Sequence, residues 1–355
     1  MTGYLILENG EIFEGERIGY NLDCAMELVT NNSNIGYMET LTDPNYFGEG
    51  VVMSYPLVGN CGIILEDFES EKIWLSALFI NEAPEFESNS YTKFNFEKYL
   101  RDYKIPGLSN MDVKKLSEII NKEGRVKAYL TSNINNIDNI LEEIKKYKIE
   151  NAISQVSTSS IKIYGKNKSK KVAILDLGFK HNIVNSLLKR DVCTIIYPYN
   201  TTFEKILSSK PDGILISNGP GNPIEYKEQI NTIKELVKSD IPILGIGLGH
   251  ELLALANSFE IENLPKPHIG INYIIKNAKT NKLYVTSQNL RYCVKRESIK
   301  NNLAEENYIC LEDKTNIGLA YKNKNILSVG FEPEGAPGPN DTLFIFDDFI
   351  NKLRS

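Results

Sequence analysis

The stretch that decides the fold reads Pro242-Ile243-Leu244-Gly245-Ile246-Gly247-Leu248-Gly249-His250-Glu251-Leu252-Leu253. A short apolar run, typical of a buried strand, passes into a helical segment through glycines on both sides of Gly247. Small neighbours permit a sharp strand-to-helix turn, and the backbone N–H groups from Leu248 onward then lie at a helix N-terminus that can bind an anion. This is the layout of a nucleophile elbow, G-x-Nu-x-G, but the central Gly247 carries no nucleophile. Taken alone, the pattern also fits a glycine-rich turn without chemistry.

The segments around this turn predict an α/β protein of two domains. After residue 172, strand-like apolar runs alternate with helix-like segments, which predicts a doubly wound parallel sheet covered on both faces. Before residue 153, short apolar runs separated by turn signals such as Asn9-Gly10 predict a β-rich α+β domain. Residues 154–171 are polar and rich in lysine, which favours a linker. The predicted organisation is therefore a domain over 1–153, a linker over 154–171 and a domain over 172–355.

Composition excludes several classes of protein. The chain has 355 residues, 42% of them hydrophobic, and a net charge of −6 with acids and bases intermixed, so there is no electrostatic footprint for nucleic acid. Its apolar runs are too short to span a bilayer, and the N-terminus does not resemble a signal peptide. Five dispersed cysteines without CxxC spacing favour free thiols in a reducing cytoplasm over disulfides or a zinc site. We therefore expect a cytoplasmic protein that binds no metal.

Two further segments connect the elbow with a known family. Together with Ser217-Asn218-Gly219-Pro220-Gly221 and Gly330-Phe331-Glu332-Pro333-Glu334, the elbow resembles a class I glutamine amidotransferase. In that family a cysteine at the elbow attacks the side-chain amide of glutamine, and the Gly-Pro-Gly loop helps to form the oxyanion hole. A late H-P-E segment supplies the histidine and glutamate that complete the triad.

Other stretches narrow the resemblance to the small subunit of carbamoyl phosphate synthase. They run through nearly the whole chain in the family's order, and they include Asn31-Asn32-Ser33-Asn34-Ile35-Gly36-Tyr37-Met38-Glu39, Leu41-Thr42-Asp43-Pro44, Glu66-Asp67-Phe68-Glu69-Ser70, Asp176-Leu177-Gly178-Phe179-Lys180 and Ala336-Pro337-Gly338-Pro339. The resemblance implies that the domain after the linker is of the class I glutamine amidotransferase type.

The chain departs from the family at two of the three triad positions. Gly247 stands at the nucleophile's position and Glu332 at the histidine's, whereas Glu334 matches the third member. A thiolate nucleophile needs a sulfur atom and a neighbouring base, and a carboxylate is a poor substitute for imidazole near neutral pH. If Glu332 and Glu334 converge, they should repel each other and raise the pKa of one carboxyl group.

The positions implied to bind glutamine are partly altered. Glu251 replaces a glutamine, Leu290 replaces a histidine, and Arg291 replaces a glycine, where its side chain could either obstruct the pocket or turn out to solvent. The positions that match the family's ligand contacts, or that supply backbone to them, are Ser33, Gly219, Gly221, Leu248, Asn289 and Tyr292. Two other side chains are interpreted as structural: His250 as part of the elbow, and Cys293 as a buried, inert thiol.

In the family, the small subunit hydrolyses glutamine and passes ammonia to a large synthetase subunit. That partner uses bicarbonate and ATP to make carbamoyl phosphate for arginine and pyrimidine synthesis. The resemblance therefore implies a large-subunit partner, with ATP and Mg²⁺ bound there and no cofactor in this chain.

The departures predict that this chain has lost glutamine hydrolysis and scaffolds or regulates an ammonia-dependent synthetase. One alternative is a stand-alone protein that binds glutamine or a related small acid in the altered pocket. Another is an active glutamine-hydrolysing subunit with unusual chemistry. The matching N-terminal stretches, Tyr37 and Glu39 included, are expected to preserve a protein-binding surface, although a folding constraint would also explain some of them.

Overall fold

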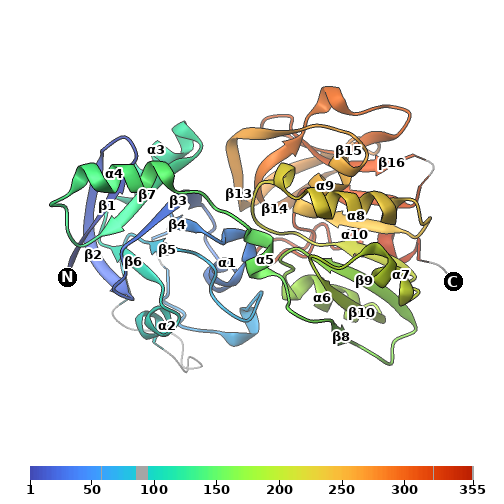
Figure 1. Ribbon diagram of the computed structural model, residues 1–355, viewed down its shortest axis with the longest axis horizontal. Helices are drawn as coiled ribbons and strands as arrows, with labels where there is room; N and C mark the ends of the chain where they lie inside the picture. The colour runs from blue at the N-terminus through green and yellow to red at the C-terminus, as the bar shows by residue number, and fades with distance from the viewer. Residues whose placement is uncertain (57, 85–94, 323, 354–355) are drawn as a thin grey trace. The chain divides into compact units, whose positions relative to one another are not determined.

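The computed structural model describes residues 1–56, 58–84, 95–322 and 324–353 (Figure 1). The chain forms two compact units, the first made of Met1–Glu150 with Pro265–Ile269 and the second of Asn151–Leu264 with Gly270–Ser355. Among the described residues, no helix has both the length and the apolar character that a membrane crossing requires.

The first unit is built on a closed barrel with strand order β1-β2-β6-β5-β4-β3-β7. The Asn9-Gly10 turn joins the first two strands as predicted: Ile6 pairs with Ile12, and Gly10 has a φ of 87° that suits glycine. The strands are β1 (Thr2–Leu7), β2 (Ile12–Gly19), β3 (Cys24–Asn31), β4 (Glu49–Met53), β5 (Ala77–Phe79), β6 (Pro106–Ser109) and β7 (Val126–Thr131).

Helices and 3₁₀ turns complete the first unit. In α3 (Val113–Glu123), Leu116 and Ile120 face the barrel core, and the Asp112 side chain caps the helix by accepting the Lys115 N–H at 2.9 Å. The remaining elements are α1 (Tyr37–Thr42), η1 (Pro44–Tyr46), η2 (Leu65–Asp67), α2 (Phe96–Asp102) and α4 (Ile137–Lys146).

The N-terminal stretches expected to preserve a binding surface are only partly interior: Asn34, Ile35 and Glu66 are exposed, and Tyr37 and Glu39 are half-buried. Leu41, Thr42 and Glu69 are buried. The hydroxyl of Thr42 accepts the Glu69 N–H at 2.9 Å, and Ser70 Oγ donates to the Thr42 carbonyl oxygen at 2.5 Å. The Tyr37 hydroxyl donates to the Gly62 carbonyl oxygen. Packing of one stretch against another therefore accounts for Thr42, Glu69 and Ser70, whereas a binding surface at the exposed members stays a prediction.

The segment expected to be a linker lies in the second unit. Residues 154–171 contain the end of α5 (Ala152–Val156), the strand β8 (Lys162–Tyr164) and the start of β9 (Lys170–Asp176). β8 pairs antiparallel with β10 (Val192–Pro198), with Ile163 opposite Ile195. The Thr158 N–H donates to Asp176 Oδ2 at 2.6 Å. This segment is polar because β8 is an edge strand whose side chains are half-buried or exposed.

The second unit is a ten-stranded sheet with order β14-β13-β15-β16-β17-β12-β11-β9-β10-β8. Its central strands, β10, β9, β11, β12 and β17, pair in parallel, as predicted for a doubly wound sheet. The strands not yet given are β11 (Gly213–Ile216), β12 (Ile243–Ile246), β13 (Ile261–Asn277), β14 (Leu283–Val294), β15 (Ala304–Cys310), β16 (Asn316–Tyr321) and β17 (Ile326–Val329).

Helices pack on both faces of this sheet. Ala173 and Leu175 of β9 lie in one apolar cluster with residues of α7, α8 and α9, whereas Val172 and Ile174 lie in another with residues of α6 and α10. The helices α8 and α9 run side by side (Figure 1). The predicted fold class is confirmed. The elements are α6 (His181–Leu188), α7 (Phe203–Ser208), η3 (Pro223–Glu225), α8 (Lys227–Val237), α9 (Leu248–Ala256), η4 (Arg296–Ser298) and α10 (Phe344–Ile350).

Candidate functional site

The sharp turn between β12 and α9 is present at Gly247. This residue has φ 54° and ψ −117°, a conformation that side-chain-bearing residues rarely adopt, and it is the N-cap of α9. Its N–H donates to the Val329 carbonyl oxygen at 2.9 Å, and its own carbonyl oxygen accepts the N–H groups of His250 and Glu251. Leu248 is buried as the first residue of the helix. The backbone of a nucleophile elbow is therefore in place.

Both flanking glycines are needed for this turn. A Cβ atom on Gly249 would lie 2.1 Å from the backbone oxygen of Ile216, and one on Gly245 would lie 2.8 Å from the backbone oxygen of Gly249. These contacts are too short for any side chain, so β11 and α9 approach as closely as the G-x-Nu-x-G pattern predicts.

Residue 247 itself has room for a side chain. A Cβ atom there would lie 3.2 Å from Cβ of Asn218, which is a tight contact with a neighbour that could shift slightly. Asn218 is only 1% exposed, and neither its amide oxygen nor its amide nitrogen has a hydrogen-bond partner. An unpaired buried amide is unusual, because burying it without a partner costs free energy. In the sequence, Asn218 stands out only as part of the Ser217-Asn218-Gly219-Pro220-Gly221 motif.

The Gly219-Pro220-Gly221 loop follows β11 and lies next to the elbow, since the Gly249 N–H donates to the Ser217 carbonyl oxygen at 3.1 Å. A Cβ atom on Gly219 would lie 2.2 Å from the Leu177 carbonyl oxygen, and Gly221 has a φ of 94°. The Tyr226 hydroxyl donates to the Pro220 carbonyl oxygen at 2.9 Å and holds the loop. Both glycines therefore have backbone reasons to be glycine.

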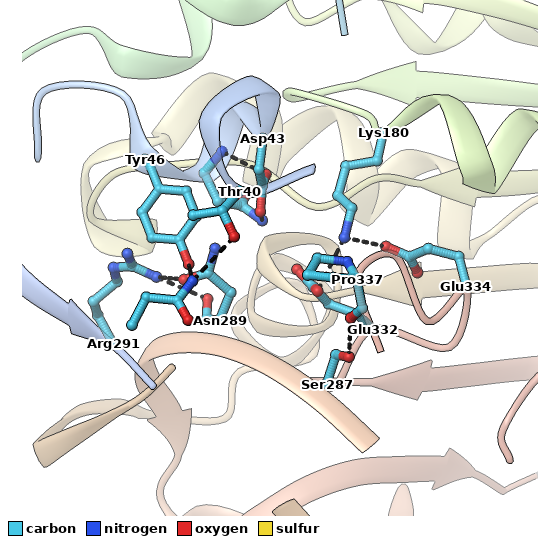
Figure 2. A network of polar contacts seen from close by, with 12 residues as sticks. Thr40, Asp43, Tyr46, Lys180, Ser287, Asn289, Arg291, Glu332, Glu334 and Pro337 are labelled. Carbon is cyan, nitrogen blue, oxygen red and sulfur yellow. Dashed lines mark hydrogen bonds and ion pairs between the residues drawn. The ribbon is translucent and has the colours of Figure 1, made fainter. Parts of the chain in front are cut away.

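Glu332 and Glu334 converge on a lysine. Nζ of Lys180 lies 2.9 Å from Glu332 Oε2 and 2.9 Å from Glu334 Oε1 (Figure 2). The exposed fractions of these side chains are 0% for Lys180, 6% for Glu332 and 0% for Glu334. Repulsion between two adjacent carboxylates was expected, but a buried ammonium lies between them. The signal was present in the sequence as Asp176-Leu177-Gly178-Phe179-Lys180, but nothing local connects residue 180 with residue 332.

The turn that carries Glu332 is tied to β14. The Glu332 N–H donates to the Ser287 carbonyl oxygen at 2.9 Å, and the Ser287 hydroxyl donates to the Pro337 carbonyl oxygen (Figure 2). These bonds fix the backbone of the segment around Glu332.

Arg291 folds back along its own strand. Its Nη1 donates to the Asn289 carbonyl oxygen at 2.9 Å and also to Asn289 Oδ1, and the side chain is half-buried (Figure 2). The Arg291 side chain was expected either to obstruct the pocket or to turn out to solvent. Instead, its guanidinium group binds the side chain and the backbone of Asn289. Leu290 is buried beside Gly330, and Tyr292 is buried as well.

Three other side chains of this region are interior. Burial lowers the pKa of His250 to about 3, and its Nδ1 lies 2.7 Å from Ser328 Oγ, as suits a structural histidine held neutral. Burial raises the pKa of Cys293 to about 12, in line with an inert thiol. Glu251 is buried in the first turn of α9.

Ser33 belongs to the first unit. It is buried, its N–H donates to Asn31 Oδ1 at 2.8 Å, and its hydroxyl has no hydrogen-bond partner. The Asn31 amide in turn donates to Thr40 Oγ1 at 3.1 Å and to the Tyr46 hydroxyl at 3.0 Å (Figure 2). The loop that carries Ser33 is therefore held by a buried polar network.

A cavity of about 310 Å³ lies at the other end of the parallel strands. It is lined by Val237, Asp240, Ile241, Lys324, Asn325 and Ile326. These residues lie shortly before β12 or around the start of β17. None of the residues predicted to bind glutamine lines it. In doubly wound sheets ligands bind at the carboxyl ends of the strands, where Lys180, Asn218, Gly247 and Glu332 follow β9, β11, β12 and β17.

The doubly wound fold of the second unit, with the elbow at the carboxyl ends of its strands, defines a protein of the class I glutamine amidotransferase type. Residues 173–352 match the family model described as glutamine amidotransferase class-I, and residues 5–130 match the model described as carbamoyl-phosphate synthase small chain, CPSase domain. The chain belongs to the carbamoyl phosphate synthase small chain family.

Two relatives agree with this assignment. The chain is 38% identical to a carbamoyl phosphate synthase small chain of Clostridium perfringens, over 99% of each chain. It is also 38% identical to one from Oceanobacillus iheyensis, over 99% of this chain and 96% of the relative. A solved glutamine amidotransferase of Thermotoga maritima is 17% identical, with a TM-score of 0.38 over 47% of this chain and 76% of that one.

Proposed function

We propose that this chain is a carbamoyl phosphate synthase small subunit that no longer hydrolyses glutamine and that scaffolds or regulates an ammonia-dependent large subunit. The observation that carries the proposal is the side chain missing at the elbow. Gly247 occupies the conformation and the helix N-terminus at which the family presents its cysteine, and a glycine offers no atom that can attack an amide.

The base position supports the same conclusion. Glutamine hydrolysis by a thiol needs a group that takes the thiol proton and returns it to the leaving ammonia, and the family uses a histidine. Here Glu332 is buried and its Oε2 is engaged by Lys180 Nζ at 2.9 Å. An oxygen that is already paired with an ammonium is a poor base for a neighbouring thiol.

The positions implied to contact glutamine are altered as well. Asn289 Oδ1, an acceptor at a position implied to contact glutamine, is bound by Arg291. Glu251 offers only acceptors where an amide would both donate and accept. Changes at the nucleophile, the base and the substrate contacts together support loss of the reaction over a change in its mechanism.

The family relationship supports a role beside a large subunit. Identity of 38% over 99% of both chains supports retention of the whole small-chain architecture. Gly247 and Glu332 stand at the positions where the resemblance implies the reactive cysteine and histidine. Under this proposal the large subunit binds ATP and Mg²⁺ and draws ammonia from the surrounding cytoplasm. The small chain then contributes binding energy or conformational control to its partner, without chemistry of its own.

A nitrogen-source experiment tests the loss of hydrolysis. The chain, alone and with the large subunit from its own genome, is supplied with bicarbonate, ATP and either glutamine or ammonium chloride. We expect carbamoyl phosphate from ammonium chloride only, and no ammonia release from glutamine. Glutamine turnover within a hundredfold of the typical enzyme value of about 10 per second would contradict the proposal.

Docking is tested by co-expression and size-exclusion chromatography. A stable interface should bury upwards of about 1,000 Å² and survive the column. We expect the 40.1 kDa chain to elute together with a synthetase subunit. Elution as a lone monomer with every candidate subunit would argue against the scaffold.

A second candidate function is a stand-alone ligand-binding protein. The buried Asn218 amide, unpaired at both atoms and adjacent to Gly247, favours it, because a small polar ligand would supply the missing partners. Glutamine, glutamate and related acids would be screened by thermal shift, with Asn218→Ala as the control. A ligand at a hundredfold its Kd stabilises a protein by about 2.7 kcal/mol, which such a screen detects easily.

A further inference from the structure

Lys180 reaches across the carboxyl edge of the second unit. It follows β9, whereas Glu332 and Glu334 follow β17, and the strand order β9-β11-β12-β17 places two strands between them. Neighbouring strands lie about 4.8 Å apart, so the contact spans roughly 14 Å of sheet. Residues 180 and 332 are joined at 2.9 Å by side chains that come from opposite sides of the elbow strand β12.

We propose that Glu332 is one of two anchors of a buried ion lock, defined as Lys180 with Glu332 and Glu334, which fastens the segment after β17 to the segment after β9. The position where the family keeps a histidine is thus committed to a structural charge pair. This inference goes beyond the proposed function and does not depend on a large subunit or on glutamine.

Charge and burial support the lock. One ammonium and two carboxylates lie together with side-chain exposures of 0%, 6% and 0%. A buried carboxylate is tolerated only when it is paired, and each of these has an oxygen 2.9 Å from the same nitrogen. Lys180 therefore compensates two charges, and removing it would leave both uncompensated.

Both ends of the lock are held rigidly. On one side, Asp176 Oδ1 accepts the N–H groups of Gly178 and Phe179 at 2.8 and 3.0 Å, which fixes the turn leading to Lys180. On the other side, the Glu332 N–H is bound to the Ser287 carbonyl oxygen. Because the backbone on both sides is already positioned, the ion pairs form with little additional loss of conformational freedom.

A double-mutant cycle tests the lock through thermal unfolding. The variants are Lys180→Met, Glu332→Gln and the two combined. Breaking a buried pair by removing one partner is strongly destabilising, so we expect Lys180→Met to lower the unfolding midpoint by about 6 °C or more. Glu332→Gln should lower the midpoint when Lys180 is present and raise it in the Lys180→Met background, where it removes an uncompensated charge.

The sign of the coupling decides the outcome. A side chain that only fills space would give the same shift in both backgrounds. The lock requires Glu332→Gln to be more favourable by roughly 3 °C or more in the Lys180→Met background, and a smaller difference overturns it.

A surface pair in the same unit provides the matched control. Lys295 Nζ also lies 2.9 Å from Glu260 Oε2, but these side chains are 42% and 67% exposed. The corresponding cycle of Lys295→Met and Glu260→Gln should show almost no coupling. Circular dichroism reports the unfolding of both units, whereas the fluorescence of Trp74, the single tryptophan, reports the first unit alone. A transition seen only by circular dichroism therefore belongs to the second unit, which contains the lock.

If Lys180→Met does not fold, a triple variant keeps the proposal falsifiable. Lys180→Met with Glu332→Gln and Glu334→Gln makes the cluster uncharged, so the lock predicts that folding is recovered. Failure of the triple variant to fold any better than Lys180→Met would overturn the lock. Neither result measures glutamine hydrolysis, and the proposed loss of hydrolysis rests on Gly247, so the lock and the proposed function can fail separately.

Discussion

The backbone N–H of Gly247 donates to the carbonyl oxygen of Val329 at 2.9 Å. This bond continues the parallel pairing of β12 with β17, in which Ile246 lies opposite Val329. It places the elbow beside the strand whose continuation carries Glu332 and Glu334. The backbone at the elbow and at the segment after β17 is therefore held together, and residue 247 presents no side chain there.

Gly247→Cys alone should not restore glutamine hydrolysis, because a triad acts as a unit and the base is still missing. Ammonia release from glutamine is the measurement, with Gly247→Ser as a variant of matched shape. The combination of Gly247→Cys with Glu332→His has a better prospect, although Glu251 and the Arg291–Asn289 contact still affect the substrate side. Substantial turnover by the single variant would reveal a base elsewhere in the site.

Alanine at Gly247 and alanine at Gly249 should give unequal losses of stability. Gly247→Ala meets Asn218 at a tolerable 3.2 Å but must hold a φ of 54°, which costs about 1–2 kcal/mol. Gly249→Ala would place Cβ 2.1 Å from the Ile216 backbone oxygen and force β11 and α9 apart, with a loss of more than about 3 kcal/mol. Urea unfolding of both variants measures the order, and equal losses would contradict this account of the turn.

His250 should make the fold less stable in acid. Burial lowers its pKa from 6.5 to about 3, so the unfolded chain takes up a proton below pH 6.5 that the folded chain refuses. The contribution of neutral His250 to the free energy of unfolding is fully present above pH 6.5 and declines as the pH falls toward 3. By linkage the loss between pH 8 and pH 5 is about 2 kcal/mol.

The measurement compares the pH dependence of unfolding in the native chain and in His250→Asn, with His181→Asn as the control. The His250 variant should lose less stability on acidification than the native chain, whatever its stability at pH 8. An unchanged difference between pH 8 and pH 5 would show that His250 is protonated in the folded state.

The cysteines should differ in their reaction with iodoacetamide. Cys61 is exposed, whereas Cys293 is buried and its pKa is raised to about 12, so very little thiolate forms there at pH 8. Mass spectrometry of the folded chain should find Cys61 modified first and Cys293 modified only after unfolding. Labelling of Cys293 within tenfold of the rate of Cys61 would reopen its role as a nucleophile.

Local sequence patterns determined the fold class and the elbow. The spacing Gly245-x-Gly247-x-Gly249 after an apolar run predicts a sharp strand-to-helix turn, because only glycine fits the close backbone contacts with Gly249 and Ile216 that such a turn creates. The absence of a thiol at 247 and of an imidazole at 332 is likewise visible in the sequence without any coordinates.

Tertiary structure decided what depends on segments far apart in the chain. Residues 154–171 have a linker's composition, yet β8 pairs with β10, because the hydrogen bonds of an edge strand leave no apolar signal in the sequence. Thr42 and Glu69 belong to two separate stretches that resemble the family. Only the tertiary structure shows that these two residues are buried against each other. Lys180 and Glu332 are separated by two strands and more than a hundred residues of chain, so no local pattern links them. Their pairing arises because a parallel sheet gathers the carboxyl ends of distant strands at one edge, where a buried charge must find its partner.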